Sequence, residues 1–250
     1  MANISAVQTS PTGAQAQPKP TPRAARHSMP PLIRMVLVPA LWAGLLFAGA
    51  GRVDWLRGWI CIGLFAITAV ACPAIAGHYN PSLLEARRTW FHKDAKRSDR
   101  ILVMTLLPLV VALPLVAGLD AARFRWSSLS FLFVYVGIIL FVLAIIVVTW
   151  TMSINPFAER AVRIQTERGH RVITSGPYHV VRHPLYTASI VMWAAVSLIL
   201  GSLWALVVTG LIAVLLSVRT AMEDRMLRQE LHGYEQYAMR TRYRLLPGIW

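Results

Sequence analysis

Two runs in the C-terminal half of the sequence carry side chains that suit the binding of a small anion. The first, His170–Tyr178, reads HRVITSGPY, and the second, Arg182–Tyr186, reads RHPLY. Gly-Pro favours a turn, and a residue before proline favours extended geometry, so we expect His183 to precede a helix that begins at Pro184. A helix N-terminus offers free N–H donors and a partial positive charge. The runs therefore predict a site for a carboxylate or phosphate, unless Tyr and Arg only anchor a helix among headgroups.

A second polar cluster lies further along the chain, where Arg219 and Glu223 are four residues apart. This spacing puts both side chains on one face of a helix. The simplest interpretation is a surface ion pair worth a few tenths of a kcal/mol, and the alternative is a pair of groups that face a bound molecule. The Tyr and Arg residues that alternate between 233 and 247 would then cover the membrane surface or close over a polar ligand.

The elements that must position these clusters are membrane-spanning helices. Of the 250 residues, 56% are hydrophobic and 14% are charged, whereas about a quarter of the residues in a soluble domain are charged. The apolar residues gather into runs long enough to cross a bilayer as helices, which takes about 20 residues. The sequence therefore predicts an all-α, polytopic transmembrane protein. Its six expected segments are roughly 31–50, 57–77, 100–119, 128–152, 185–200 and 202–221.

The last two segments come from one long apolar stretch that is interrupted at Gly201-Ser202. Glycine suits a tight reversal better than a helix interior, so we expect a C-terminal helical hairpin, with one very long helix as the alternative. A hairpin brings both polar clusters to the same face of the membrane.

Positive charge decides the orientation, because cytoplasmic loops carry the excess of Lys and Arg. With the N-terminus in the cytoplasm, only Arg52, Arg57, Arg123 and Arg125 of the 25 basic residues fall on the opposite side. We therefore expect both termini in the cytoplasm. The net charge of +14 then reflects basic loops beside anionic headgroups. Because no soluble domain is expected to present a basic face, we expect no nucleic-acid partner.

The rest of the sequence adds little chemistry. Residues 1–30 have the composition of a flexible tail, rich in Pro, Ala, Gln, Thr and Ser. Cys61 and Cys72 fall in the second segment, where we expect small apolar packing residues rather than a disulfide or a metal site. The expected segments hold almost no ionisable residues, which disfavours a pump or transporter.

The pattern His170-x-Val-Ile-Thr-x-Gly-x-Tyr178, followed by Arg182-His-Pro-x-Tyr186, resembles the signature of the isoprenylcysteine carboxyl methyltransferase family. Phospholipid N-methyltransferases of membranes share much of this signature. The resemblance covers about 155–247 and extends more weakly from Asn80 to Arg100. It implies a membrane methyltransferase that uses S-adenosylmethionine. The implied acceptor is lipophilic, with a carboxylate, an amine or a thiol as the nucleophile.

The resemblance also assigns roles residue by residue. Glu223 would contact the cofactor and Arg219 the substrate, which makes these two the catalytic candidates. Gln165 corresponds to a further cofactor contact if the alignment includes a gap. Asp224 stands where many members carry a second glutamate, which leaves its role open. The other implied cofactor contacts are His170, Arg171, Val172, Ile173, Tyr178, Arg182, His183, Pro184, Leu185 and Tyr186.

Two other functions remain open. Membrane sterol reductases that use NADPH also carry an Arg-His-Pro-x-Tyr-like element near a C-terminal hairpin, and a non-enzymatic membrane scaffold would bind neither cofactor. The run His170–Tyr178 and the pair Arg219 and Glu223 favour the methyltransferase.

The expected organisation has three parts. A tail at 1–30 precedes four transmembrane helices at 31–154, which include a basic loop at 78–100. Residues 155–250 form the S-adenosylmethionine-binding region, with the terminal hairpin and a cytoplasmic cofactor pocket. We expect a multi-pass protein of the bacterial inner membrane, whose partners are the lipid bilayer and a lipophilic or lipidated substrate.

Overall fold

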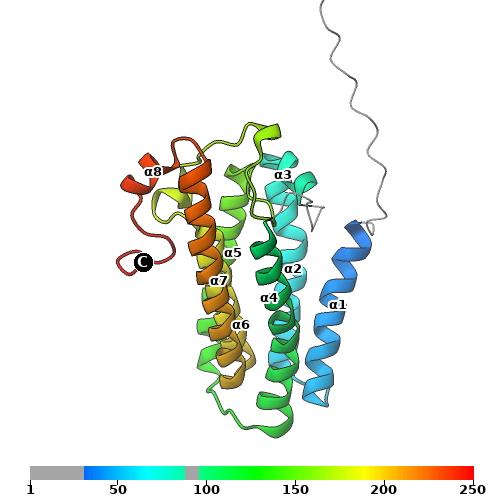
Figure 1. The fold of residues 1–250 in the computed structure, drawn as a ribbon. Coiled ribbons are helices and arrows are strands. Elements are labelled where there is room, and N and C mark those ends of the chain that lie inside the picture. The colour runs from blue at the N-terminus through cyan, green and yellow to red at the C-terminus, as the bar shows by residue number, and fades with distance from the viewer. Residues whose placement is uncertain (1–30, 88–95) are drawn as a thin grey trace, which may run out of the picture.

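The computed structural model describes residues 31–87 and 96–250, and Figure 1 shows the bundle that they form. The expected tail at 1–30 and part of the expected basic loop, 88–95, lie outside the described residues. Within the described ranges the chain is helical and contains no strand. The helices are α1 (Pro31–Ala50), α2 (Leu56–Tyr79), α3 (Pro81–Ala86), α4 (Arg97–Ala117), η1 (Gly118–Phe124), α5 (Leu132–Ile154), η2 (Thr166–Arg168), η3 (Gly176–His179), α6 (Pro184–Leu200), α7 (Leu203–Glu230) and α8 (Tyr234–Arg240).

The six expected membrane segments correspond to α1, α2, α4, α5, α6 and α7. Four helices of the described chain are long and apolar enough to cross a membrane, and two shorter apolar helices, Leu37–Ala50 and Pro184–Leu200, complete the set. The all-α, polytopic prediction is thus confirmed. The largest difference is at the end of α7, which continues to Glu230 instead of stopping near 221. The apolar pattern stops there, but the helix continues because polar side chains on its last turns find partners.

The hairpin between α6 and α7 is also confirmed. Gly201 adopts φ +76°, and its N–H bonds to the carbonyls of Ser197 and Leu198, which ends α6. Glycine adopts this left-handed conformation at little cost. Ser202 then caps α7, because its side chain accepts a hydrogen bond from the N–H of Ala205. The start of α6 and the end of α7 therefore lie at the same end of the bundle (Figure 1).

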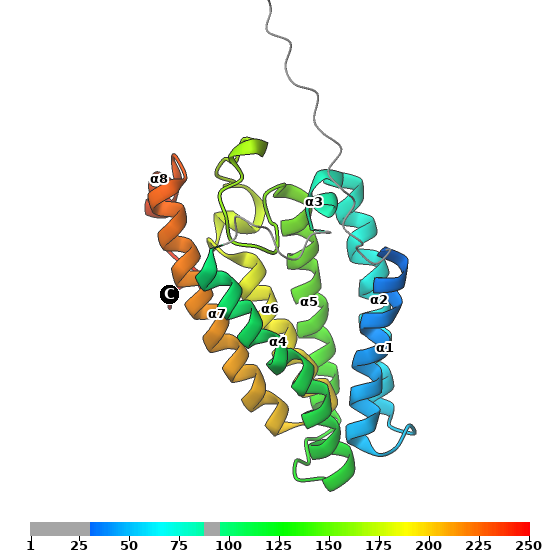
Figure 2. The same cartoon turned by 45° about the vertical axis from the view of Figure 1, so that its right-hand side comes forward.

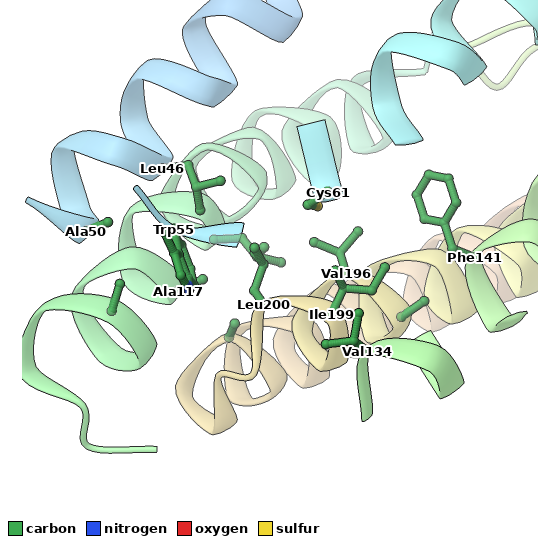
Figure 3. Close-up of a cluster of buried hydrophobic side chains, with 14 of the residues drawn as sticks. Leu46, Ala50, Trp55, Cys61, Ala117, Val134, Phe141, Val196, Ile199 and Leu200 are labelled. Carbon is green, nitrogen blue, oxygen red and sulfur yellow. The ribbon is translucent and has the colours of Figure 1, made fainter. Parts of the chain in front are cut away.

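The main hydrophobic core joins α5 and α6 to α1 and α2. Figure 3 shows Ile199 of α6 beside Val134 of α5, with Leu46 of α1 and Cys61 of α2 nearby, and all four are almost fully buried. The expectation that Cys61 packs as a small apolar side chain agrees with this position. The core therefore fixes α6, the helix whose first turn belongs to the predicted site.

A polar contact closes the opposite end of the bundle. Asp120, in the π-helical turn after α4, is fully buried. One of its carboxylate oxygens accepts hydrogen bonds from the hydroxyls of Ser127 (2.7 Å) and Ser202 (2.5 Å). A charge-assisted bond of this kind is stronger than a neutral one. It ties the turn of the hairpin to the end of α4.

Gly137 allows the close approach of α5 to α6. A Cβ atom at this position would lie 2.8 Å from the carbonyl oxygen of Ala195 and 3.0 Å from the backbone nitrogen of Ile199. We predict that Gly137→Ala destabilises the protein by about 1–3 kcal/mol, because the backbone of α6 must move. Thermal unfolding in detergent measures this change. Gly63→Ala is the control, since its Cβ meets nothing within 4 Å, and equal melting temperatures for the two variants would contradict the prediction.

Candidate functional site

A cavity of about 370 Å³ lies where α4 begins, α5 ends and α6 begins. Its wall is formed by α4, α5, α6 and α7, by the segment 155–183 that connects α5 to α6, and by α8. Figure 2 shows α4, α6 and α7 next to one another, with this connecting segment at their end. The volume is within the range of small-molecule sites.

Both predicted polar clusters line this one cavity. Tyr178, His183 and Tyr186 come from the two runs before and within α6, and Arg219 and Glu223 come from α7. The Tyr186 hydroxyl donates a hydrogen bond of 2.5 Å to the Glu223 carboxylate, which joins the clusters directly. The remaining predicted residues on the wall are His170, Arg171, Val172, Ile173, Arg182, Pro184 and Leu185.

The first turn of α6 is held by the C-terminal segment. Helix α6 begins at Pro184, as predicted, and His183 precedes it. The backbone N–H groups of Arg182 and His183 donate to the carbonyls of Tyr243 (2.9 Å) and Arg244 (3.0 Å). Two donors that the helix cannot satisfy are thereby paired, and the orientation of the His183 ring beside the cavity depends on this contact.

Asp224 lies behind the first turn of α6, and its contacts explain the role that the sequence left open. Its carboxylate is fully buried and accepts two hydrogen bonds from Arg182 (2.7 and 3.1 Å), one from Arg244 (3.0 Å) and one from Tyr234 (3.0 Å). His183 Nε2 is 3.4 Å from the same carboxylate. A buried carboxylate is stable only when it is paired and hydrogen-bonded in this way. Asp224 therefore positions the RHPLY run.

Arg182 was predicted to contact the cofactor, and it does line the cavity. Its side chain is nevertheless only 3% exposed. Besides Asp224, its guanidinium donates to the carbonyls of Thr241 and Arg242. Most of its donors are therefore used inside the protein.

We predict that Asp224→Asn destabilises the protein by about 3–5 kcal/mol, because it leaves buried arginines without their counter-charge. Thermal unfolding in detergent should show a large drop in melting temperature, and limited proteolysis should cut the C-terminal segment sooner. Glu235→Gln, at an exposed position of α8, is the matched control. Two variants with equal stability would show that the Asp224 network is dispensable.

Arg219 and Glu223 do not form the simple surface ion pair that their spacing allows. The Nε of Arg219 donates to Asp99 of α4 (2.7 Å), and one terminal nitrogen donates to the carbonyl of Arg160 (2.6 Å). Asp99 also accepts from the backbone N–H of Val162 (3.1 Å). Asp99 was not among the residues predicted for the site, although an isolated acid in the first turn of an otherwise apolar helix was an available signal.

Gln165 takes a different place from the one predicted. Its side chain is buried, donates to the carbonyl of Phe157 (2.8 Å) and accepts from Arg168 (2.6 Å), and it does not belong to the cavity wall. Its backbone N–H donates to Nδ1 of His170 (3.3 Å), whose ring stacks on Phe157 with centroids 4.5 Å apart. Gln165 thus positions two rings that line the cavity.

His170 is held in its neutral form. Burial lowers its pKa, and this outweighs Glu223 and Glu159, which act to raise it. The hydrogen bond that Nδ1 accepts also requires an unprotonated nitrogen there. Because the folded pKa is below the unfolded value of about 6.5, His170 contributes stability that is present above this pH and lost as the pH falls through the folded pKa.

We therefore predict that acidification from pH 7 to pH 5 lowers the melting temperature of the wild type more than that of His170→Asn. The Asn side-chain oxygen can accept the same hydrogen bond without titrating. His232→Asn, at an exposed position, should behave like the wild type. An identical pH dependence in all three proteins would exclude this role for His170.

The charge on the cavity wall is mainly positive. An anionic group is therefore favoured in the cavity, and the carboxylates can hold a cationic group beside it. Burial lowers the pKa of Arg87, and its guanidinium donates to the carbonyl of Ala158. The arginines on the wall are Arg87, Arg100, Arg160, Arg163, Arg171, Arg182 and Arg219, and the carboxylates are Asp99, Glu159 and Glu223.

A comparison with known families covers the part of the chain that carries most of this site. The family model of the phospholipid methyltransferases matches residues 132–233, which run from the start of α5 to just after α7. This range includes Tyr178, His183, Tyr186, Arg219 and Glu223, whereas Asp99 lies before it. None of the curated proteins compared with the chain matches it. Residues 132–233 are thus similar to the phospholipid methyltransferase family, which supports a membrane methyltransferase, and the apolar helices support an integral membrane protein.

Proposed function

We propose that the protein transfers a methyl group from S-adenosylmethionine to a lipophilic acceptor that enters from the membrane. The observation that carries this proposal is the single cavity in which the two polar clusters of the methyltransferase domain meet. One end of the cavity is lined by charged side chains. The other end continues between the helices and is lined by apolar ones, so a polar donor and an apolar acceptor can share it.

The residues on the wall fit S-adenosylmethionine. Its ammonium group suits Glu223, a carboxylate on the wall. Its carboxylate suits an arginine such as Arg171, which also lines the cavity. Its adenine is flat and suits an aromatic neighbour, and the stacked rings of Phe157 and His170 lie on the same wall. All three recognition groups therefore come from the connecting segment and α7.

S-adenosylmethionine held by these residues would supply an electrophilic methyl group to the lone pair of the acceptor, and its sulfur would keep the electron pair of the broken bond. The protein must align the two partners and exclude water. Asp99 and the Arg160 carbonyl fix the guanidinium of Arg219. So held, Arg219 can orient an anionic acceptor without losing much side-chain freedom.

Tyr186 contacts two charged side chains of α7, Arg219 and Glu223. Its hydroxyl donates to Glu223, and its ring lies 5.5 Å below the guanidinium carbon of Arg219. A cation over an aromatic ring is attracted to its face. Tyr186 thus contacts both Arg219 and Glu223 on the cavity wall.

The direction of entry follows from the charge distribution. The donor is soluble in water, and the polar end of the cavity is at the end of the bundle that carries Arg87 and Arg100. Cytoplasmic loops carry the excess of basic residues. We therefore propose that this end faces the cytoplasm and that the acceptor approaches from the lipid.

Calorimetry with S-adenosylhomocysteine tests the cofactor. The purified wild type should bind it, and Glu223→Gln should weaken the binding by about 10- to 100-fold, because a charge-assisted hydrogen bond is lost. Glu85→Gln, on the exposed surface of α3, should bind like the wild type. A preference of the wild type for NADPH would favour the reductase, and binding of neither compound would favour the scaffold.

A further inference from the structure

The apolar end of the cavity reaches a similar depth on four helices. Measured from the polar groups, the lining residues run from Arg100 to Leu106 in α4, from Asn155, just after α5, back to Val148, from Tyr186 to Trp193 in α6, and from Glu223 back to Leu216 in α7. Each of these ranges covers about two helical turns, which is about 10 Å along the helix axis. The cavity therefore has one apolar arm between these four helices, which extends about 10 Å below the polar groups.

Trp193 forms the floor of this arm on α6. Tyr186, Ser189 and Trp193 line the cavity at the spacing of one helix face, and Trp193 is the last of them. The residues that follow on α6, such as Val196, are buried in the main hydrophobic core. Below Trp193 the space between the helices is therefore filled by protein.

The indole of Trp193 is fixed by its neighbours. Its ring is 6.2 Å from the ring of Phe65, which itself makes an edge contact with Phe141 at 5.4 Å. A side chain packed in this way moves only if the core rearranges. The floor therefore has a fixed height, and a chain in the arm cannot lower it.

We propose that Trp193 sets the length of the apolar chain that the acceptor can place in the cavity. This inference rests on the proposed function, because it assigns the arm to the acceptor. Each methylene that leaves water for a fitted apolar site contributes to binding until the chain meets the floor. Beyond that length, further methylenes have no space and contribute nothing.

The test uses saturated fatty acids from hexanoate to hexadecanoate as probes of the arm. Their binding to the wild type and to Trp193→Ala is measured by calorimetry in the same detergent, with and without S-adenosylhomocysteine. The ratio of the two dissociation constants at each chain length cancels the partition of the probe into micelles.

We expect the ratio to be constant for short chains and then to increase in favour of Trp193→Ala, by up to about fourfold per methylene, once the chain exceeds the wild-type limit. Trp193→Phe keeps a ring against Phe65, so it should fold even if Trp193→Ala does not, and it should give a smaller shift of the same sign. Ser189→Leu adds volume one turn above Trp193, and it should shorten the accepted chain.

Trp204→Ala is the matched control, because its side chain is 54% exposed on α7 and far from the arm along that helix. It should leave the ratio unchanged at every chain length. The inference is overturned if neither Trp193→Phe nor Ser189→Leu shifts the accepted length, since the chain then leaves sideways between the helices. If the wild type does not bind S-adenosylhomocysteine, the proposed function is refuted instead. The fatty-acid series measured without S-adenosylhomocysteine then still tests the role of Trp193.

Discussion

The buried carboxylate of Asp224 is the interaction on which the site depends. A carboxylate without water is unstable unless several donors replace the water. Here the donors come from three parts of the chain: Arg182 before α6, Arg228 and Tyr234 at the end of α7 and the start of α8, and Arg244 in the C-terminal segment. Because all of them must converge on one charge, the RHPLY run has one available position, and the aromatic wall of the cavity follows from it.

The rest of the bundle places this charged region beside an apolar one. The hairpin at Gly201 returns α7 to the level at which α6 begins, and α4 adds Asp99 from the other side. The cavity therefore has a charged end and an arm lined by residues such as Leu106 and Leu216. A site with these two ends can hold groups that prefer different solvents, as the proposed transfer of a methyl group to a lipid-soluble molecule requires.

The helices, the hairpin and the meeting of the two clusters could be predicted from the sequence. The signals for them, which are apolar runs, a Gly-Ser interruption and local spacing, all involve residues that are close together in the chain. The sequence did not predict Asp99, whose partner Arg219 is far away in the chain, or the depth of the arm, which depends on how four helices pack. The position of Arg182 beside the cavity was also predicted. Its ion pair with Asp224 was not, because a buried partner that is distant in the chain leaves no local sequence pattern.

The contact between Asp99 and Arg219 also affects whether the part of the chain that matches the methyltransferase family can be separated from the rest. The part of the chain that matches the methyltransferase family ends before the C-terminal segment and begins after α4. Cut out or grafted onto other helices, it would carry Arg219 and Asp224 without Asp99 and Arg244, two of the groups that balance their charges. The helices and the C-terminal segment outside the matched range are therefore more than a membrane anchor, because they supply charges that balance Arg219 and Asp224.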